Sequence, residues 1–268
     1  MTFARMIPAI TAALLLIGSS SVLADTEKKT TREESSFGAL KAPDPAEARK
    51  QAETWLKSVG KTDAGSLAKF NSIWTADRPL LDKVASTLAL GDSAAARLLS
   101  EARDASTPAP TEIPALLKDA KKPAFFRNNL ALAYARALTS RKVYEEALET
   151  FTQVKPEEVV DPSAYFFHKA VCEHALMLKD KADGSIDRLL VDVVDAPERH
   201  RMVAALMHFD MLTWQEKDLG WIARKMDNIQ RRLDLKRGGK HTQKMQKEVL
   251  VRLDEMIKEI ENKQKGGS

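Results

Sequence analysis

The sequence predicts an all-α fold in which helical hairpins stack side by side, and three observations support this prediction. Tyr144, Ala147, Phe151 and Val154 are spaced three, four and three residues apart, which places all four on one face of a helix. A similar pattern returns 35 positions later along the chain. The composition is dominated by good helix formers and lacks alternating β-branched runs, so it favours helices over strands.

The two similar segments lie between residues 131 and 190. An offset of 35 matches small residues with small ones and large apolar residues with large ones: Ala135 with Ala170, Ala147 with Ala182, Phe151 with Ile186, and Val154 with Leu189. A small residue lets two helices approach closely, and a large apolar residue fills the space beside it. The pattern predicts two stacked hairpins; an irregular bundle of the same hairpins, without stacking, is the alternative.

The first segment resembles a tetratricopeptide repeat, whose second helix carries a tyrosine, a small alanine and a phenylalanine at these offsets. It departs from that family because the first helix lacks the tryptophan, and because Lys142 and Met177 stand where the inter-helix turn usually has glycine. The resemblance implies a short TPR-like helical solenoid but no particular ligand. The chain also resembles the uncharacterised exported helical-repeat proteins of bacteria, which implies an export setting and no activity.

The N-terminus has the pattern of a secretory signal peptide. Arg5 is the only charged residue before Asp25, an apolar run extends from Ile7 to Gly18, and Val22–Ala24 fits a small-residue cleavage site. The run is too short to span a bilayer, although a retained N-terminal anchor is the alternative. We therefore expect removal of residues 1–24, no transmembrane helix in the mature form, and a periplasmic, cell-surface or secreted location.

The rest of the chain divides by its prolines, glycines and charges. Gly60, Gly91 and the cluster of Pro108, Pro110 and Pro114 interrupt otherwise helical patterns. The expected segments are a disordered leader over 25–45, an N-terminal helical segment over 46–104, a Pro-rich linker over 105–123, TPR-like repeats over 124–198, C-terminal helices with a hairpin over 199–263, and a tail over 264–268. Within the N-terminal segment, helices are expected over 45–59, 66–74, 79–90 and 93–103.

The C-terminal segment begins like a third repeat and then changes. The offset of 35 places Ala205 on Ala170, but it places Lys217 on Ala182, so the second helix of a third repeat is missing. Two stripes with spacings of four, three and four follow, on either side of the turn 237–240: Ile222, Met226, Ile229 and Leu233, then Val249, Leu253, Met256 and Ile260. They predict an antiparallel hairpin that caps the solenoid within one chain, and hence a monomer.

No pattern of catalytic or metal-binding residues is found. His168 and the single cysteine, Cys172, lie four residues apart, but no carboxylate or further cysteine completes a metal site, so a buried thiol at a helix contact is preferred. His200 and His208 are expected at the surface or half-buried. The Gly-Gly pair within 237–240 lacks the spacing of a nucleotide loop and is expected to form a turn. We expect no catalytic residue, no metal and no cofactor.

Two kinds of partner remain. The leading hypothesis is a non-enzymatic scaffold that binds a peptide or partner protein in a helical-repeat groove lined by Tyr134, Tyr165 and Phe166. The alternative uses the excess charge after residue 198, where 16 Lys or Arg face 10 Asp or Glu. Arg237, Lys240 and Lys244 near the turn would then bind an anionic lipid or glycan surface; no nucleic acid is expected. An enzyme is the third possibility, marked by a deep closed pocket with convergent polar groups.

Overall fold

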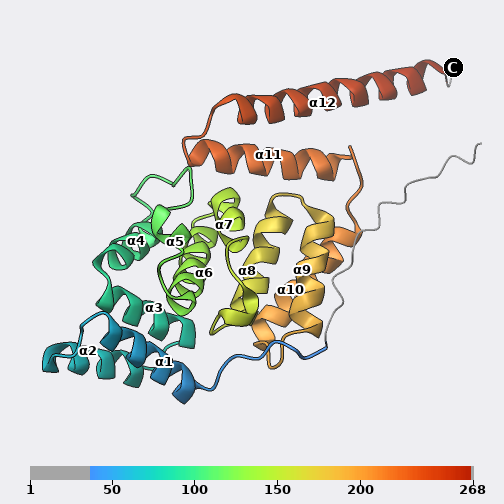
Figure 1. Cartoon of the computed structure of the whole chain (residues 1–268). Coiled ribbons are helices and arrows are strands. Elements are labelled where there is room, and N and C mark those ends of the chain that lie inside the picture. Colours follow the sequence, from blue (N-terminus) through green and yellow to red (C-terminus); the bar gives the residue numbers. More distant parts are fainter. Residues whose placement is uncertain (1–36, 267–268) are drawn as a thin grey trace, which may run out of the picture. The chain divides into compact units, whose positions relative to one another are not determined.

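The computed structural model describes residues 37–266 and is helical over that range, which confirms the prediction of an all-α chain (Figure 1). Within these residues the only bridge between extended segments pairs Leu40 with Val193. The predicted signal peptide lies outside the described residues. In chain order the helices are α1 (Pro45–Ser58), α2 (Ala64–Thr75), α3 (Leu80–Gly91), α4 (Ser93–Arg103), α5 (Ala115–Lys118), α6 (Ala124–Ser140), α7 (Tyr144–Phe151), α8 (Pro162–Ala175), α9 (Lys179–Val191), α10 (Glu198–Leu212), α11 (Leu219–Asp234) and α12 (Lys240–Gly266), with a 3-10 turn at Pro156–Glu158.

Local sequence signals set the beginnings of many helices. Five helices follow an aspartate whose side chain accepts hydrogen bonds from backbone N–H groups of the first turn, which otherwise lack partners. These residues are Asp44, Asp63, Asp92, Asp161 and Asp218. Pro45 and Pro162 occupy first-turn positions, where the missing N–H of proline costs nothing.

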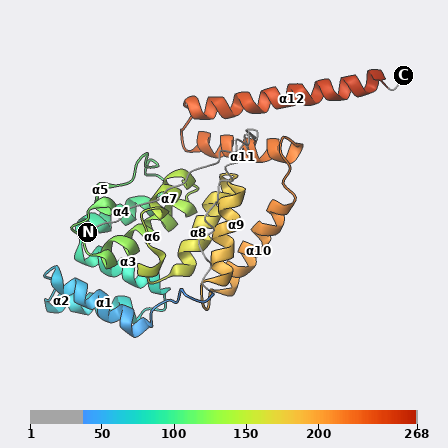
Figure 2. The same cartoon turned by 45° about the vertical axis from the view of Figure 1, so that its right-hand side comes forward.

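Neighbouring helices pair along the chain. α3 packs on α4, α6 on α7, and α8 on α9, while α7 and α6 both contact α8, and α10 packs against α8 and α9 (Figures 1 and 2). α4 and α3 also contact α6, so the N-terminal helices and the central hairpins share one hydrophobic core. α11 and α12 lie side by side across one end of these helices, and both views show α12 extending past α11.

The residues related by the offset of 35 lie inside this core. Ala135, Ala170, Ala147 and Ala182 are fully buried, and their four large apolar counterparts are no more than 5% exposed. The rings of Phe151 and Tyr165 are nearly perpendicular, with 5.6 Å between their centroids, and this contact joins the two hairpins. The sequence pattern therefore correctly identified these eight residues as buried.

The turns inside the two hairpins have the same backbone conformation. Lys142 and Met177 both adopt φ of 60°, the left-handed region that is unfavourable for residues other than glycine. In each turn the following residue donates a backbone hydrogen bond to a carbonyl five residues earlier: Val143 to Leu138 at 2.9 Å, and Leu178 to Glu173 at 2.8 Å. These bonds satisfy carbonyls at the end of the helix and hold the strained residue in place.

Gly91 is required by a close contact at the end of α3. A β-carbon at this position would lie 2.5 Å from two ring carbons of Trp55, which itself is buried and stacks on Phe126. We expect Gly91→Ala to lower the free energy of unfolding by about 1–3 kcal/mol through overpacking. Urea unfolding would measure this loss, and Gly184→Ala, where a β-carbon meets no atom within 4 Å, serves as the control. An unchanged midpoint for Gly91→Ala would show that Trp55 can move away without cost.

Parts of the expected leader and of the expected Pro-rich linker pack against the folded helices. The end of the predicted disordered leader is ordered, because Leu40 is 6% exposed and exchanges backbone hydrogen bonds with Asp192 and Val194. The Pro-rich stretch is not a free linker, because Ile113 and Leu117 enter the core with 4% and 3% exposure. Both segments have enough apolar side chains to bury, although their overall polarity is high.

The expected apolar stripes of the C-terminal helices are only partly buried. Ile222, Ile229, Met245 and Val249 form a small core between α11 and α12, but Met226 and Leu233 are 54% and 46% exposed. Ile260, near the end of α12, is 55% exposed. The reason is that a second face of α11 is occupied by polar contacts with the central hairpins. On α10, Ala204 rather than Ala205 is the fully buried alanine.

Candidate functional site

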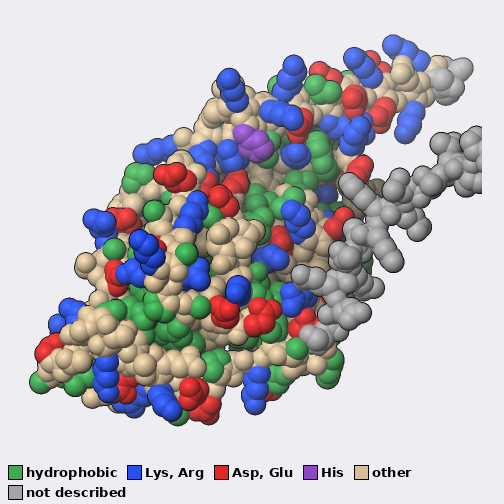
Figure 3. Space-filling view, viewed as in Figure 1, with side chains coloured by type: hydrophobic (Ala, Val, Ile, Leu, Met, Phe, Trp, Pro, Cys, Tyr) green, Lys and Arg blue, Asp and Glu red, His purple; other side chains and the backbone are tan. Residues whose placement is uncertain are grey.

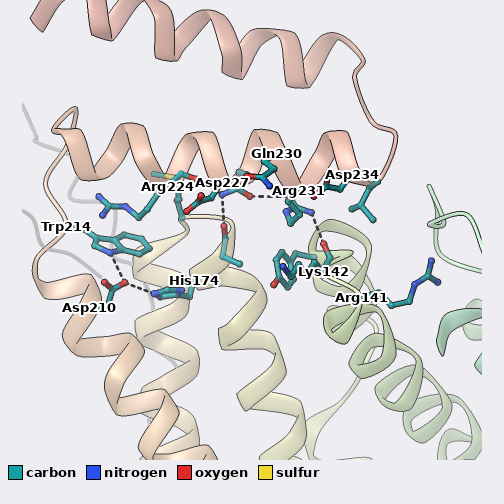
Figure 4. A pocket seen from close by; sticks show the side chains of 15 residues that line it. Arg141, Lys142, His174, Asp210, Trp214, Arg224, Asp227, Gln230, Arg231 and Asp234 are labelled. Atoms are coloured by element: carbon teal, nitrogen blue, oxygen red, sulfur yellow. Dashed lines mark hydrogen bonds and ion pairs between the residues drawn. The ribbon is translucent and has the colours of Figure 1, made fainter. Parts of the chain in front are cut away.

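A pocket of about 510 Å³ opens between α11 and the ends of α6–α8 and α10 (Figure 4). Its volume lies in the usual range for small-ligand sites. Charged side chains of both signs and two aromatic rings surround it. The lining residues are Arg141, Lys142, Tyr144, His174, Ala175, Met177, Asp210, Trp214, Arg224, Asp227, Asn228, Gln230, Arg231, Asp234 and Leu235.

Polar side chains of α11 form one wall of the pocket and bind the ends of the hairpins. Asn228 donates to the carbonyl of Ala175, the last residue of α8, at 2.7 Å. Arg231 donates to the carbonyl of Lys142, in the turn after α6, at 2.9 Å. Carbonyls at helix ends lack partners within the helix, so these two bonds both orient α11 and satisfy acceptors at the hairpin ends. Figure 4 shows the contact between Arg231 and Lys142 as a dashed line.

Acidic residues at the start of α7 meet a cluster of arginines from α11 and the turn after it. Arg231 makes two hydrogen bonds of 2.8 Å with the carboxylate of Glu145, and Arg232 contacts the same carboxylate. Arg237 pairs with Glu146 at 2.9 Å. Burial alone would raise the pKa of Glu145, but the hydrogen bonds and charge of Arg231 outweigh it and lower the pKa to about 2. This network fastens α11 to α7.

We expect Glu145→Gln to lower the free energy of unfolding by about 2 kcal/mol at neutral pH, because it leaves buried arginines without a counter-charge. The carboxylate keeps 28% exposure, so the loss should be smaller than for a fully buried pair. The pKa of Glu145 is depressed in the fold, so its stabilisation is present above about pH 4.5 and is lost as the pH falls toward about 2. Urea unfolding of both proteins across this range should show the difference shrinking with acid. Glu149→Gln, an exposed site on the same helix, is the control; equal losses for the two variants would contradict the network's role.

The opposite end of the pocket contains a second group of interacting side chains. Asp210 accepts a hydrogen bond from the Trp214 indole at 2.9 Å and lies 2.9 Å from Nε2 of His174. The guanidinium of Arg224 lies over the Trp214 ring at 4.6 Å. The distance between its guanidinium and the carboxylate of Asp218 is 3.8 Å, which is longer than a hydrogen bond. Stacking on Trp214 therefore positions Arg224. Asp218 is too far away to form a hydrogen-bonded ion pair with it.

Comparisons of the chain with protein-family models, curated protein sequences and solved structures found no match. Within residues 37–266, no group of three or more His, Cys, Asp or Glu side chains is arranged to hold a metal ion. Over the same range, none of the helices combines the length and apolar character needed to cross a membrane.

The aromatic residues predicted to line a partner-binding groove do not line one. Tyr134, Tyr165 and Phe166 are 3%, 6% and 1% exposed, and their rings are part of the core between hairpins. Burial raises the pKa of the Tyr134 hydroxyl to about 12. The error arose because a tyrosine or phenylalanine on a repeat helix can serve either packing or binding, and only the neighbouring helices decide between them.

The residues of the predicted anion-binding tip are separated by the structure. Arg237 is held by Glu146 and by the carbonyl of Pro110, whereas Lys240 and Lys244 are exposed. Figure 3 shows basic side chains over α12 interspersed with acidic ones. Lys240 and Lys244 are therefore exposed on one side of α12, and Arg237 does not form a basic cluster with them.

The histidines and the cysteine considered as candidates lie mostly at helix contacts. Cys172 is fully buried, 3.3 Å from the Thr139 hydroxyl. His200, predicted to be at the surface or half-buried, is only 6% exposed; its Nδ1 lies 2.8 Å from the hydroxyl of Ser163, and its ring stacks on Phe167 at 4.2 Å. Both members of this Ser–His pair are buried, so a substrate has no access to it. Its geometry supports a structural role between α8 and α10.

Sequence reasoning missed Arg224, Trp214 and Asp210 as members of one site. Trp214 and Asp210 are four residues apart at the end of α10, and this spacing was a usable signal for a local contact. Arg224 belongs to a different helix, and its place over Trp214 depends on how the chain turns between α10 and α11. No pattern within either helix indicates that turn.

Proposed function

We propose that the protein is an exported, non-enzymatic interaction scaffold, and that the pocket beside α11 binds a carboxylate-bearing peptide segment of a partner protein. The observation that carries the proposal is Arg224. This side chain lines the pocket, is positioned by stacking on Trp214, and lies 3.8 Å from the carboxylate of Asp218, too far for a hydrogen bond. A cation held in this way keeps donors for a ligand carboxylate, with which arginine forms short charge-assisted hydrogen bonds.

The other residues of the pocket suit a peptide. The two terminal nitrogens of the Arg231 guanidinium are occupied by Glu145, Asn228 and the carbonyl of Lys142, so Arg231 shapes the wall. The ring of Tyr144 and the carboxylates of Asp227 and Asp234 add an apolar surface and hydrogen-bond acceptors. A peptide carries backbone donors and acceptors along with apolar side chains, and can therefore use a pocket of mixed character.

The helix arrangement supports a TPR-like scaffold for this site. The offset of 35 relates buried positions in α6–α7 to those in α8–α9, and both hairpins use the same left-handed turn at Lys142 and Met177. We propose that α11 and α12 act as the cap of this short solenoid, because α11 binds the hairpin ends through Asn228 and Arg231. The signal-peptide pattern of residues 1–24 supports export.

Selection from a displayed library of random decapeptides against the full chain tests the proposal. We expect the enriched peptides to contain a carboxylate, and Arg224→Gln to weaken their binding by at least about tenfold, the loss of roughly one charge-assisted hydrogen bond. Trp214→Leu should weaken binding similarly, because Arg224 loses the ring that positions it. Lys118→Gln makes the same charge change at an exposed position on α5 and should leave binding unchanged.

Two results would contradict this function. A selection that enriches nothing would argue against a peptide ligand, and peptides that bind Arg224→Gln as well as the parent would place the site elsewhere.

The alternative, binding of an anionic surface, rests on the exposed Lys240 and Lys244. In that case vesicles with anionic lipids would bind the parent and lose binding to Lys240→Glu/Lys244→Glu and to added salt, with no effect of Arg224→Gln.

A further inference from the structure

Helix α10 exposes a row of large apolar side chains. Met202, Leu206 and Phe209 are 57%, 64% and 63% exposed and lie on one face at helical spacing. Val203 and Leu212, at 41% and 60% exposure, widen the row on its two sides. The opposite face of the helix, which includes Ala204 and Met211, is buried against the preceding hairpin. A contiguous patch of this kind on a folded chain marks an interaction surface.

We infer that a second copy of this chain covers the face, with the two α10 helices antiparallel about a twofold axis between Ala205 and Leu206. In this register Met202 lies opposite Phe209 of the partner subunit, and Ala205 lies opposite Leu206 of the partner subunit. The small side chain of Ala205 thus packs against the large side chain of Leu206 of the partner subunit, which lets the side chains of the two helices interdigitate closely. The apolar row is nearly symmetric about its centre, as a twofold contact between identical surfaces requires.

The charges beside the row are also self-complementary. Arg199, Val203 and Asp210 fall on the same flank of α10 at 100° per residue. In an antiparallel pair, identical flanks meet, so Arg199 is brought near Asp210 of the partner subunit, and the symmetry repeats the contact. Arg199 is exposed, and the Asp210 side chain keeps 53% exposure despite its contacts with His174 and Trp214. A parallel pair would instead bring opposite flanks of the two helices together, and this contact would be lost.

The leader of the same chain does not cover the apolar row of α10 in place of a second copy. The described chain begins close to α10, since Leu40 pairs with Val193 shortly before the helix starts. Once the predicted signal peptide is removed, the remaining residues 25–36 contain no apolar side chain that could cover the row. The five exposed side chains present roughly 100 Å² each, or about 1,000 Å² in a pair of copies, which is near the lower limit for specific interfaces. The association is therefore a reversible, concentration-dependent dimer, in contrast to the monomer expected from the terminal stripes alone.

Sedimentation of the full chain between about 1 and about 300 µM, a range that brackets a weak dimer, measures this association. We expect the average mass to rise from that of one copy toward that of two. Leu206→Glu should remain monomeric over the whole range with an unchanged thermal melt. Met226→Glu places the same charge at a comparably exposed apolar site on α11 and should still dimerise. A parent that stays monomeric throughout, or a Leu206→Glu variant that still dimerises, overturns the proposal.

Cysteine cross-linking tests the register and does not depend on Leu206→Glu remaining folded. The native Cys172 is fully buried, so it does not compete at the surface. Under mild oxidation, a mixture of Met202→Cys and Phe209→Cys chains should form the mixed disulfide dimer, whereas each variant alone should not. Cross-linking within each single variant would indicate a parallel pair, and a dimer whose mixture does not cross-link would place the interface on another surface; either result overturns the proposal.

Discussion

Phe151→Ala is expected to lower the free energy of unfolding by about 3–5 kcal/mol, the usual cost of removing a buried phenylalanine. The ring is fully buried and contacts Tyr165 of the next hairpin edge to face at 5.6 Å. Alanine removes this contact and leaves a cavity where α6, α7 and α8 meet, because fixed helices can only partly close around it. Urea unfolding monitored by circular dichroism measures the loss.

Phe37→Ala provides the matched control, because that ring is 90% exposed and its removal should change the free energy of unfolding by less than about 0.5 kcal/mol. If the two variants had equal midpoints of urea unfolding, the packing of Phe151 would not contribute to the stability of the fold. A loss confined to a separate early transition would instead show that the two hairpins unfold independently of the remaining helices.

Acidification is expected to produce the second large effect, through the histidines between α8 and α10. Burial, together with the positive charges of Arg136 and Arg199 and the neighbouring His200, lowers the pKa of His168 to about 3. Burial and Arg199 lower the pKa of His200 to about 4. As the pH falls below the ordinary value of 6.5, the unfolded chain binds protons that the folded chain does not. The stabilisation that depends on the neutral histidines is therefore fully present above about pH 6.5, and it is lost as the pH falls toward about 4.

Between about pH 7 and about pH 4, the free energy of unfolding should show a net loss on the order of 3 kcal/mol. It is less than the sum for two histidines because Asp161 acts in the opposite sense: burial raises the pKa of this carboxyl, so the folded chain takes up its proton earlier. Urea unfolding at several pH values measures the profile. His200→Gln should flatten it, whereas His241→Gln, at an exposed position on α12, should not. A parent whose stability is constant over this interval would contradict the neutral, buried state of the histidines.

The sequence alone determined the helices and much of the central core. The cap residues, the prolines and the helical spacing act between residues close in the chain, so they fix where α4 begins at Ser93 or where α8 begins at Pro162 without help from distant parts. The 35-residue offset also identified Phe151 and Ile186 as core residues, because an apolar face with strict periodicity has to be buried somewhere.

Only the tertiary structure decided which faces of the last helices remain exposed and where the pocket lies. Periodicity assigned Met226 to the interior of the hairpin, but α11 instead turns Arg231 inward to meet Glu145, 86 residues earlier in the chain. Arg224 likewise gains its place from Trp214 on another helix. Such contacts depend on which helices become neighbours, and the free energy that selects the neighbours comes from packing and charge pairing between distant segments. Local periodicity, which arises within a single helix, contains no information about that choice.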